Sequence, residues 1–176
     1  MDKAQSDHLA RVHHLRESFV EANERLVARL RRVSDEAAER EAADAWSAAQ
    51  IGWHVAAVTT RFAALIGGDL AGPQPLPDGF RERPWAEVAS AVPERVKASA
   101  AVTPPPGVRR GDAVAALEAS GTRMARAFDT LTPERGGRMG VTHAIVGTIS
   151  VYQIAEWATA HVARHNRQAK RVLGEG

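Results

Sequence analysis

The chain has 176 residues, of which 44% are hydrophobic and 25% are charged, as is typical of a single globular domain over residues 1–176. It contains no cysteine, which excludes disulfides, cysteine nucleophiles, thiolate metal sites and iron–sulfur clusters. The 23 Lys and Arg residues stand against 21 Asp and Glu residues. The resulting formal net charge of +2 is too balanced to predict nucleic-acid binding.

The sequence gives no sign of export or of a membrane anchor. Its first residues, MDKAQSDH, carry charges where a secretory signal would have an apolar run. No stretch approaches the roughly 18 apolar residues of a membrane span. We therefore expect a cytoplasmic protein that does not associate with membranes.

The first periodic segment predicts a helix over about residues 6–33. Its apolar residues recur at steps of three and four, as a helix with one buried face requires. This stripe consists of Leu9, Val12, Leu15, Phe19, Ala22, Leu26, Leu30 and Val33. The linker that follows, over residues 34–45, is polar and acidic, although its alanines could form some helix.

A second helix is expected over about residues 46–66. Ser47 is the expected N-cap, and Gly67 with Gly68 forms a strong stop. The expected inward stripe of this segment consists of Ile51, His54 or Val55, Val58, Phe62 and Leu65. A histidine is therefore expected beside or within the apolar face of the helix.

The segment from Gly67 to Gly111 is expected to be a long crossover. It begins with GGDLAGPQPLPDGF and carries TPPPG near its end, and both runs are rich in helix breakers. One or two short helices could form between them. No segment of the chain shows the alternation of a β-strand.

Two further long helices are expected. The third follows Gly111, with Asp112 as its N-cap, and ends near Pro133. The fourth covers about residues 149–172. Its stripe consists of Val151, Ile154, Ala158, His161, His165, Gln168 and Val172.

Four long amphipathic helices predict an all-α fold, a four-helix bundle. The shorter connections make the first and second helices an antiparallel pair, and likewise the third and fourth. The long crossover between the second and third helices allows these two to run in the same direction.

The spacing of two histidines suggests a metal site. His161 and His165 are four residues apart, which places two imidazoles about 6 Å apart on one helix face. Such a pair can chelate one ion, and His54 could supply a third nitrogen. Two unpaired rings buried between helices would otherwise cost about 1–3 kcal/mol each. The alternative is that each ring hydrogen-bonds to a carbonyl, a hydroxyl or a water inside the bundle.

Two segments resemble the DinB/YfiT-like proteins. WSAAQIGWH, over residues 46–54, is similar to the signature of their second helix. HAIVGTISVYQIAEWATAHVARHNRQ, over residues 143–168, is similar to their C-terminal signature, in which a His…Gly loop leads into a helix with H-x-x-x-H followed by Gln. The resemblance covers nearly the whole chain, and the crossover is its least similar part.

The resemblance implies an up-down-down-up four-helix bundle, often a homodimer. It also implies a divalent metal, nickel or zinc, held by His54, His161 and His165. Characterised relatives include transferases and isomerases that use a low-molecular-weight thiol such as bacillithiol or mycothiol. In these enzymes the metal binds the thiol sulfur and increases the fraction present as thiolate.

Three functions follow from these expectations, each with a small-molecule substrate or none. The first is thiol-dependent transfer. Because the chain has no cysteine, the reacting sulfur would have to come from a bound low-molecular-weight thiol. The second is metal-dependent hydrolysis, which would want a carboxylate as general base. No HExxH motif is present, and Glu156 should project away from the ligand face. The third is a non-catalytic, metal-stabilised dimeric module connected with stress. A ferritin-type di-iron site is excluded because no E-x-x-H pair exists.

Neighbouring residues receive secondary roles. Gln50 lies one turn before His54, where its amide could orient the imidazole or a bound water. Trp53 and Trp157 are expected in the core or the pocket wall. The remaining histidines are expected on the surface (His8, His13 and His14) or hydrogen-bonded in a loop (His143). The last helix is basic through Arg164, Arg167, Lys170 and Arg171, which suits a solvated face and, as a minority interpretation, could attract carboxylates of a thiol cofactor.

Overall fold

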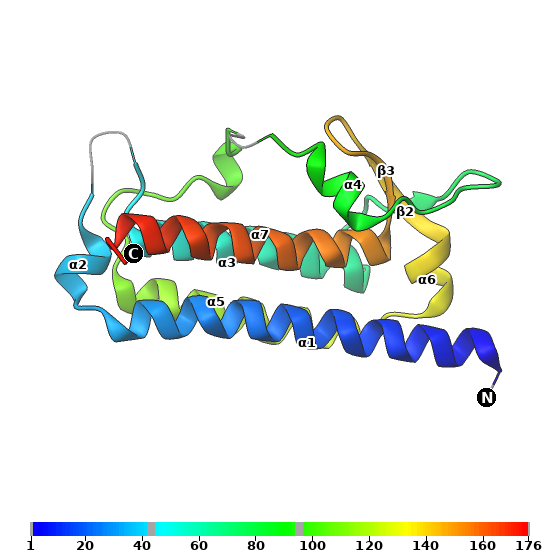
Figure 1. The fold of residues 1–176 in the computed structure, drawn as a ribbon, viewed down its shortest axis with the longest axis horizontal. Coiled ribbons are helices and arrows are strands. Elements are labelled where there is room, and N and C mark those ends of the chain that lie inside the picture. The colour runs from blue at the N-terminus through cyan, green and yellow to red at the C-terminus, as the bar shows by residue number, and fades with distance from the viewer. Residues whose placement is uncertain (1, 42–44, 94–96, 176) are drawn as a thin grey trace.

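A computed structural model describes residues 2–41, 45–93 and 97–175, which form a mainly helical protein (Figure 1). The linker predicted over 34–45 and the crossover from Gly67 to Gly111 thus fall partly outside the described ranges. The helices are α1 (Lys3–Arg32), α2 (Asp35–Glu39), α3 (Ala48–Gly67), α4 (Trp85–Ser90), the 3-10 helix η1 (Ala100–Val102), α5 (Arg110–Asp129), α6 (Pro133–Arg138) and α7 (Val151–Val172). The strands are β1 (Gln74–Pro75), β2 (Met139–His143) and β3 (Gly147–Ser150).

The four long helices lie side by side in two layers, with α3 and α7 in one and α1 and α5 in the other (Figure 1). α3 and α1 each pack against both α5 and α7. These are the four long helices predicted from the hydrophobic periodicity. None of the helices in the described ranges is both long and apolar enough to cross a bilayer.

The core lies where the apolar faces of these four helices meet. Its largest fully buried side chains include Phe19, Leu26, Leu30, Ile51, Ile66, Leu117, Met124, Phe128 and Ile154. Burial of side chains of this size is worth about 1.5–3 kcal/mol each before the cost of chain entropy. The core therefore holds α3 and α7 in a fixed relation to each other.

The buried face of α1 is offset by one residue from the predicted stripe at its N-terminal end. Leu9, which was predicted to be buried, is 48% exposed, whereas His8 is only 7% exposed. His8 lies seven residues before the buried Leu15 and therefore shares its face. The prediction of a surface position for His8 is wrong, while His13 and His14 are exposed as expected.

The ends of α3 form as the sequence predicts. The Ser47 hydroxyl accepts a hydrogen bond from the backbone N–H of Gln50, and the Gln50 side-chain oxygen accepts one from the N–H of Ser47. This reciprocal pair is a capping box. At the other end Gly68 adopts a left-handed conformation with φ of +94°, which glycine accommodates without strain.

The start of α5 differs from the prediction. The helix begins at Arg110 rather than after Asp112, and Asp112 lies within its first turn. The carboxylate of Glu39, at the end of α2, accepts a hydrogen bond of 2.9 Å from the backbone N–H of Arg110. A side chain from another element thus satisfies a donor that a local N-cap would otherwise have bound.

A small antiparallel sheet departs from the all-α prediction. Its strand order is β1-β2-β3, so that it joins the crossover to the chain entering α7. The strands have only two to five residues, too few for an alternating pattern to be recognised. Gly140 in β2 pairs with Ser150, and a Cβ atom there would lie 2.2 Å from the carbonyl oxygen of Ile149.

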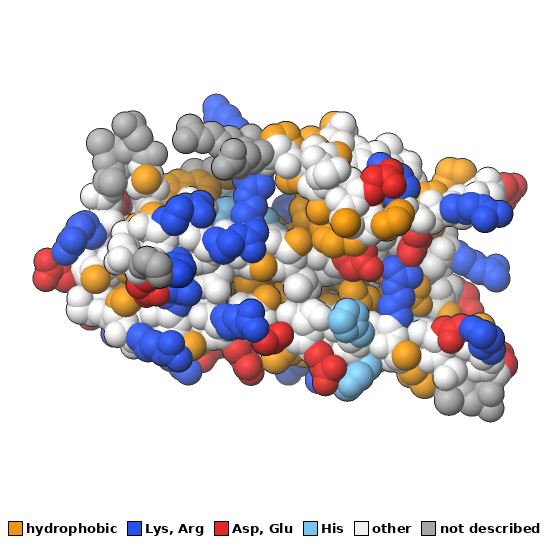
Figure 2. Space-filling view, in the orientation of Figure 1, with side chains coloured by type: hydrophobic (Ala, Val, Ile, Leu, Met, Phe, Trp, Pro, Cys, Tyr) orange, Lys and Arg blue, Asp and Glu red, His pale blue; other side chains and the backbone are white. Residues whose placement is uncertain are grey.

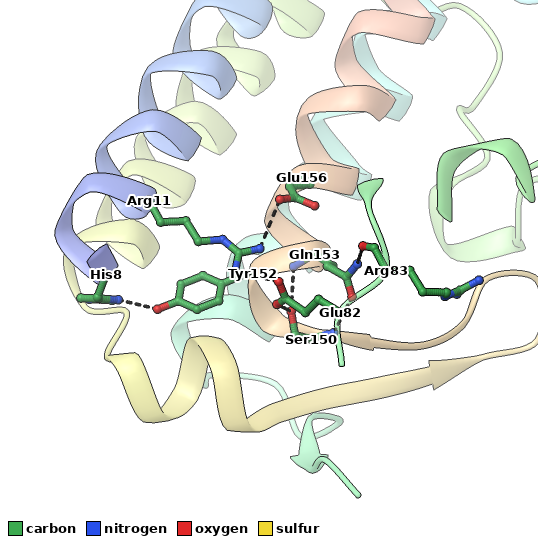
Figure 3. A network of polar contacts seen from close by, with 8 residues as sticks. All are labelled: His8, Arg11, Glu82, Arg83, Ser150, Tyr152, Gln153 and Glu156. Atoms are coloured by element: carbon green, nitrogen blue, oxygen red, sulfur yellow. Dashed lines mark hydrogen bonds and ion pairs between the residues drawn. The ribbon is translucent and has the colours of Figure 1, made fainter. Parts of the chain in front are cut away.

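Polar contacts fasten the N-terminal half of α1 to the crossover and to α7 (Figure 3). The guanidinium of Arg11 lies 4.1 Å from the centre of the Tyr152 ring and forms ion pairs with Glu82 (2.8 Å) and Glu156 (3.2 Å). The Tyr152 hydroxyl lies 2.6 Å from Nδ1 of His8. Glu156 therefore faces α1, away from the histidines of α7, as predicted.

The same cluster anchors the crossover at the start of α7 (Figure 3). The hydroxyl of Ser150 donates to the carboxylate of Glu82, and the amide of Gln153 donates to the carbonyl of Arg83 at 2.8 Å. Ser150 and Gln153 also form the capping box of α7. The helix cap and the attachment of the crossover thus use the same two side chains.

Replacing Gly140 by Ala is expected to lower the free energy of unfolding by about 1–3 kcal/mol. The new methyl group would meet the backbone of β3 and also Leu76 Cδ2, 2.5 Å away, so that the strands must separate. Gly111→Ala is a matched control, since nothing lies within 4 Å of a Cβ at that position. Urea denaturation of both variants and of the unmodified protein measures the effect. If Gly140→Ala were as stable as the unmodified protein, the assigned strand register would be wrong.

Candidate metal centre

Three histidines meet between α3 and α7. His54 comes from α3, and His161 and His165 come from successive turns of α7. One potential ligand atom of each lies within 4.8 Å of the other two, and the ring centres are 4.4 to 5.2 Å apart. Zinc ligands lie about 2.0–2.1 Å from the ion, so that small side-chain rotations would let the three nitrogens share one. The structure thus brings together the three histidines that the sequence singled out.

The orientation of His54 is set by the crossover. Its Nδ1 lies 2.7 Å from the carbonyl oxygen of Val102 in η1, and since a carbonyl can only accept, Nδ1–H donates. This contact places the proton on Nδ1 and leaves the lone pair on Nε2. The Trp46 ring, in the irregular segment directly before α3, packs against the imidazole with 4.8 Å between the ring centres.

The two histidines of α7 differ in their partners. Nδ1 of His165 lies 2.7 Å from the side-chain oxygen of Gln168, one turn further along α7, which again leaves Nε2 without the proton. Nδ1 of His161 is buried and has no hydrogen-bond partner among the described residues. An unpartnered buried nitrogen is unfavourable, and a metal ion at this position would satisfy the imidazole. The donor set therefore fits a divalent ion.

Burial keeps all three rings neutral. It is the main cause that lowers the pKa of His54, that of His161 to well below its ordinary value, and that of His165 to about 4. The mutual proximity of the rings and the positive charge of Arg164 lower the pKa of His161 and His165 further. Neutral imidazole is the form that binds a metal, so no deprotonation is needed at neutral pH.

The histidines lie in the wall of a cavity of about 540 Å³. This volume is in the range of small-molecule sites. Trp46, Phe62, Trp85 and Trp157 contribute aromatic surface, and the centre of the Phe62 ring lies 5.9 Å from Trp157 and 6.3 Å from His161. A ligand in this cavity would therefore contact both the three nitrogens and an apolar wall.

The other predicted neighbours have mixed outcomes. Trp157 lines the cavity, and Trp53 packs, partly buried, against the hydrophobic core, so that both lie where they were expected. The amide of Gln50 does not act on His54, because its nitrogen donates to Glu41 (2.9 Å) and to the carbonyl of Pro105 (3.1 Å). Its oxygen belongs to the capping box of α3, so that this side chain serves the helix end and the crossover.

Sequence reasoning missed several contributors to the site. Nothing in the crossover singles out Val102, because any residue could supply a backbone carbonyl. Trp46 and Phe62 were identified only as part of a motif or a core stripe. His143, at the end of β2, lines the same cavity, and its Nδ1 accepts the N–H of Ile145 at 3.2 Å. This is the local hydrogen bonding expected of it. The bond between His165 and Gln168 could have been expected from their spacing of three residues.

Acidification is expected to destabilise the metal-free protein between about pH 6.5 and pH 4. The pKa of His165 is about 4 in the fold against an ordinary value of 6.5, so the unfolded chain binds the proton first. The free energy of unfolding should therefore decrease as the pH falls through this interval, and this contribution should be fully present above it. Urea denaturation of chelator-treated protein at several pH values measures the slope.

His165→Gln should reduce this slope, and His13→Gln, at an exposed position on α1, should not. The comparison between variants is necessary because burial raises the pKa of Glu156, which affects stability with the opposite sign. An unchanged slope in His165→Gln would show that this ring is not buried in its neutral form.

The sequence was compared with known proteins. A family model with the description DinB superfamily matches residues 18–169, which include all three histidines and all of α3 and α5. No curated protein gives a significant match to the chain. The family match covers most of the chain and includes both segments whose motifs suggested this family. The chain belongs to the DinB superfamily.

Proposed function

We propose that the protein is a divalent-metal-dependent enzyme that transfers a group to or from a low-molecular-weight thiol of the bacillithiol or mycothiol type. His54, His161 and His165 would hold the ion, either nickel or zinc, since three imidazoles suit both. The observation that carries the proposal is the convergence of three neutral imidazoles in the wall of a small-molecule cavity. The proposal includes the up-down-down-up order of the long helices, a cytoplasmic homodimer and a small-molecule substrate.

The open cavity favours an enzyme over a non-catalytic module. A structural zinc site uses four protein ligands, whereas a catalytic site has three and leaves a position for substrate. Within the described ranges, the group of potential ligands contains only the three histidines. They adjoin a cavity large enough for a substrate, which a purely structural site does not need.

The residues around the site prepare these ligands. The carbonyl of Val102 and the amide oxygen of Gln168 hold the rings of His54 and His165 with Nε2 available. A divalent ion bound there would supply Lewis acidity that increases the fraction of a thiol present as thiolate at neutral pH. Trp157 and Phe62 exclude water from one side of His161 and offer apolar surface to the electrophile.

The charge of the cavity wall favours transfer over hydrolysis. None of the described residues that line the cavity is an aspartate or a glutamate. Hydrolysis commonly relies on such a carboxylate to accept a proton from water. Glu156 does not supply it, because its carboxylate pairs with Arg11 on the other side of α7. A thiolate needs no general base once its proton has been lost.

Metal content tests the ligand assignment. Protein purified without an affinity tag is expected to contain about one nickel or zinc ion per chain by elemental analysis. His54→Ala, His161→Ala and His165→Ala should each weaken the affinity by more than the roughly 10- to 100-fold typical for loss of an outer hydrogen-bond partner. His143→Ala, in the same cavity, should retain the ion. Unchanged content in His161→Ala would exclude that ligand.

Turnover tests the reaction. Reduced cellular thiols are mixed with an electrophilic acceptor, with and without added nickel or zinc, and loss of free thiol is followed together with product. Transfer requires that turnover depend on both thiol and metal. Cleavage of esters or amides without thiol would instead support the hydrolase, and bound metal without either reaction would support the module.

A further inference from the structure

The cavity beside the three histidines is lined by positive charge. Arg61 on α3, Lys97 before η1, and Arg164 and Arg167 on α7 all contribute to its wall, and we refer to these four residues as the cationic rim. No acidic side chain among the described residues lines the cavity with them.

Two members of the cationic rim, Arg61 and Arg167, keep their charge without an ion pair to any described residue. Arg11, by contrast, does not line the cavity and forms ion pairs with Glu82 and Glu156. Arg61 and Arg167 are also exposed. In Figure 2, histidine atoms are visible in a hollow behind several Lys and Arg side chains.

Arg164 brings this charge close to the histidines. Its guanidinium donates to the carbonyl of Pro93 at 3.0 Å, which holds it across the cavity from α7 to the crossover. With a divalent ion present, the positive charge of the ion would add to that of the rim. Such a cavity, with low-dielectric aromatic walls, attracts anions and disfavours cations.

We propose that the cavity selects a small molecule that joins a flat apolar body to a carboxylate, with the body against Trp46, Phe62 and Trp157 and the carboxylate at the cationic rim. This inference deepens the proposed function, on which it rests, by naming the substrate class of the same cavity. The aromatic rings supply affinity through buried area. The rim supplies selectivity, because an amine in place of the carboxylate would be repelled.

Binding of three probes with a common body tests this selectivity. 3-Phenylpropionate, 3-phenylpropanol and 3-phenylpropylamine are titrated into chelator-treated protein, and binding is followed by calorimetry and by tryptophan fluorescence. The acid is expected to bind at least about fivefold more tightly than the alcohol, and the amine most weakly. Salt at about 1 M, where the Debye length is about 3 Å, should remove the advantage of the acid but not the binding of the alcohol.

Variants of the cationic rim identify the residues involved. Arg61→Gln and Arg167→Gln are each expected to weaken binding of 3-phenylpropionate about threefold to fivefold and to leave 3-phenylpropanol unchanged. Arg123→Gln is the matched control, since Arg123 is also exposed but lies on α5 and does not line the cavity. Equal affinity for the three probes, or equal losses in all three variants, would overturn the proposal.

Repeating the titration with nickel or zinc separates this inference from the proposed function. Selectivity for the acid in metal-free protein supports the cationic rim whether or not a metal binds. If the acid binds only after metal is added, the ion rather than the rim recognises the carboxylate and the inference fails, while the metal site stands. If the protein binds no metal but still selects the acid, the proposed function fails and the rim remains.

Discussion

Burial of three imidazoles at one point between α3 and α7 is the constraint on which the rest of the site depends. An imidazolium is poorly tolerated in this environment, and three together would also repel one another, so that all three rings remain neutral. Neutral rings in turn need partners for their nitrogens. The structure provides Val102 for His54 and Gln168 for His165, and it leaves Nδ1 of His161 without one. A single cation bound by all three rings would give a nitrogen of each ring a partner.

The crossover contributes more to this arrangement than its composition suggests. At one end β1 pairs with β2, and Glu82 contacts Arg11 and Ser150. At the other end Glu41 accepts hydrogen bonds from the side chain of Gln50 and from the N–H of Gly107. Between these two attachments, the described residues Trp85 and Lys97 line the cavity, and the carbonyl of Val102 reaches His54.

Hydrophobic periodicity was sufficient to predict the four long helices and the two segments that supply the histidines. It succeeded because His54, His161 and His165 occupy positions where the apolar stripes of α3 and α7 face each other. It failed where structure depends on contacts between distant residues. The start of α5 is bound by Glu39 rather than Asp112, the sheet consists of strands too short to show a pattern, and His8 rather than Leu9 lies on the buried face of α1. Gln50 was expected to orient His54 because it lies one turn before it, but its hydrogen bonds instead form the cap of α3 and attach the crossover.

The partner of His54 is a main-chain oxygen, and this affects how the site can change over evolutionary time. Every amino acid offers the same carbonyl, so this hydrogen bond places no requirement on the side chain at position 102, which is constrained only by its own burial. A ligand-orienting contact of this kind leaves no trace in residue identity. Lineages could therefore diversify the crossover, and with it the shape of the cavity above the histidines, without losing the device that turns the imidazole of α3 toward α7.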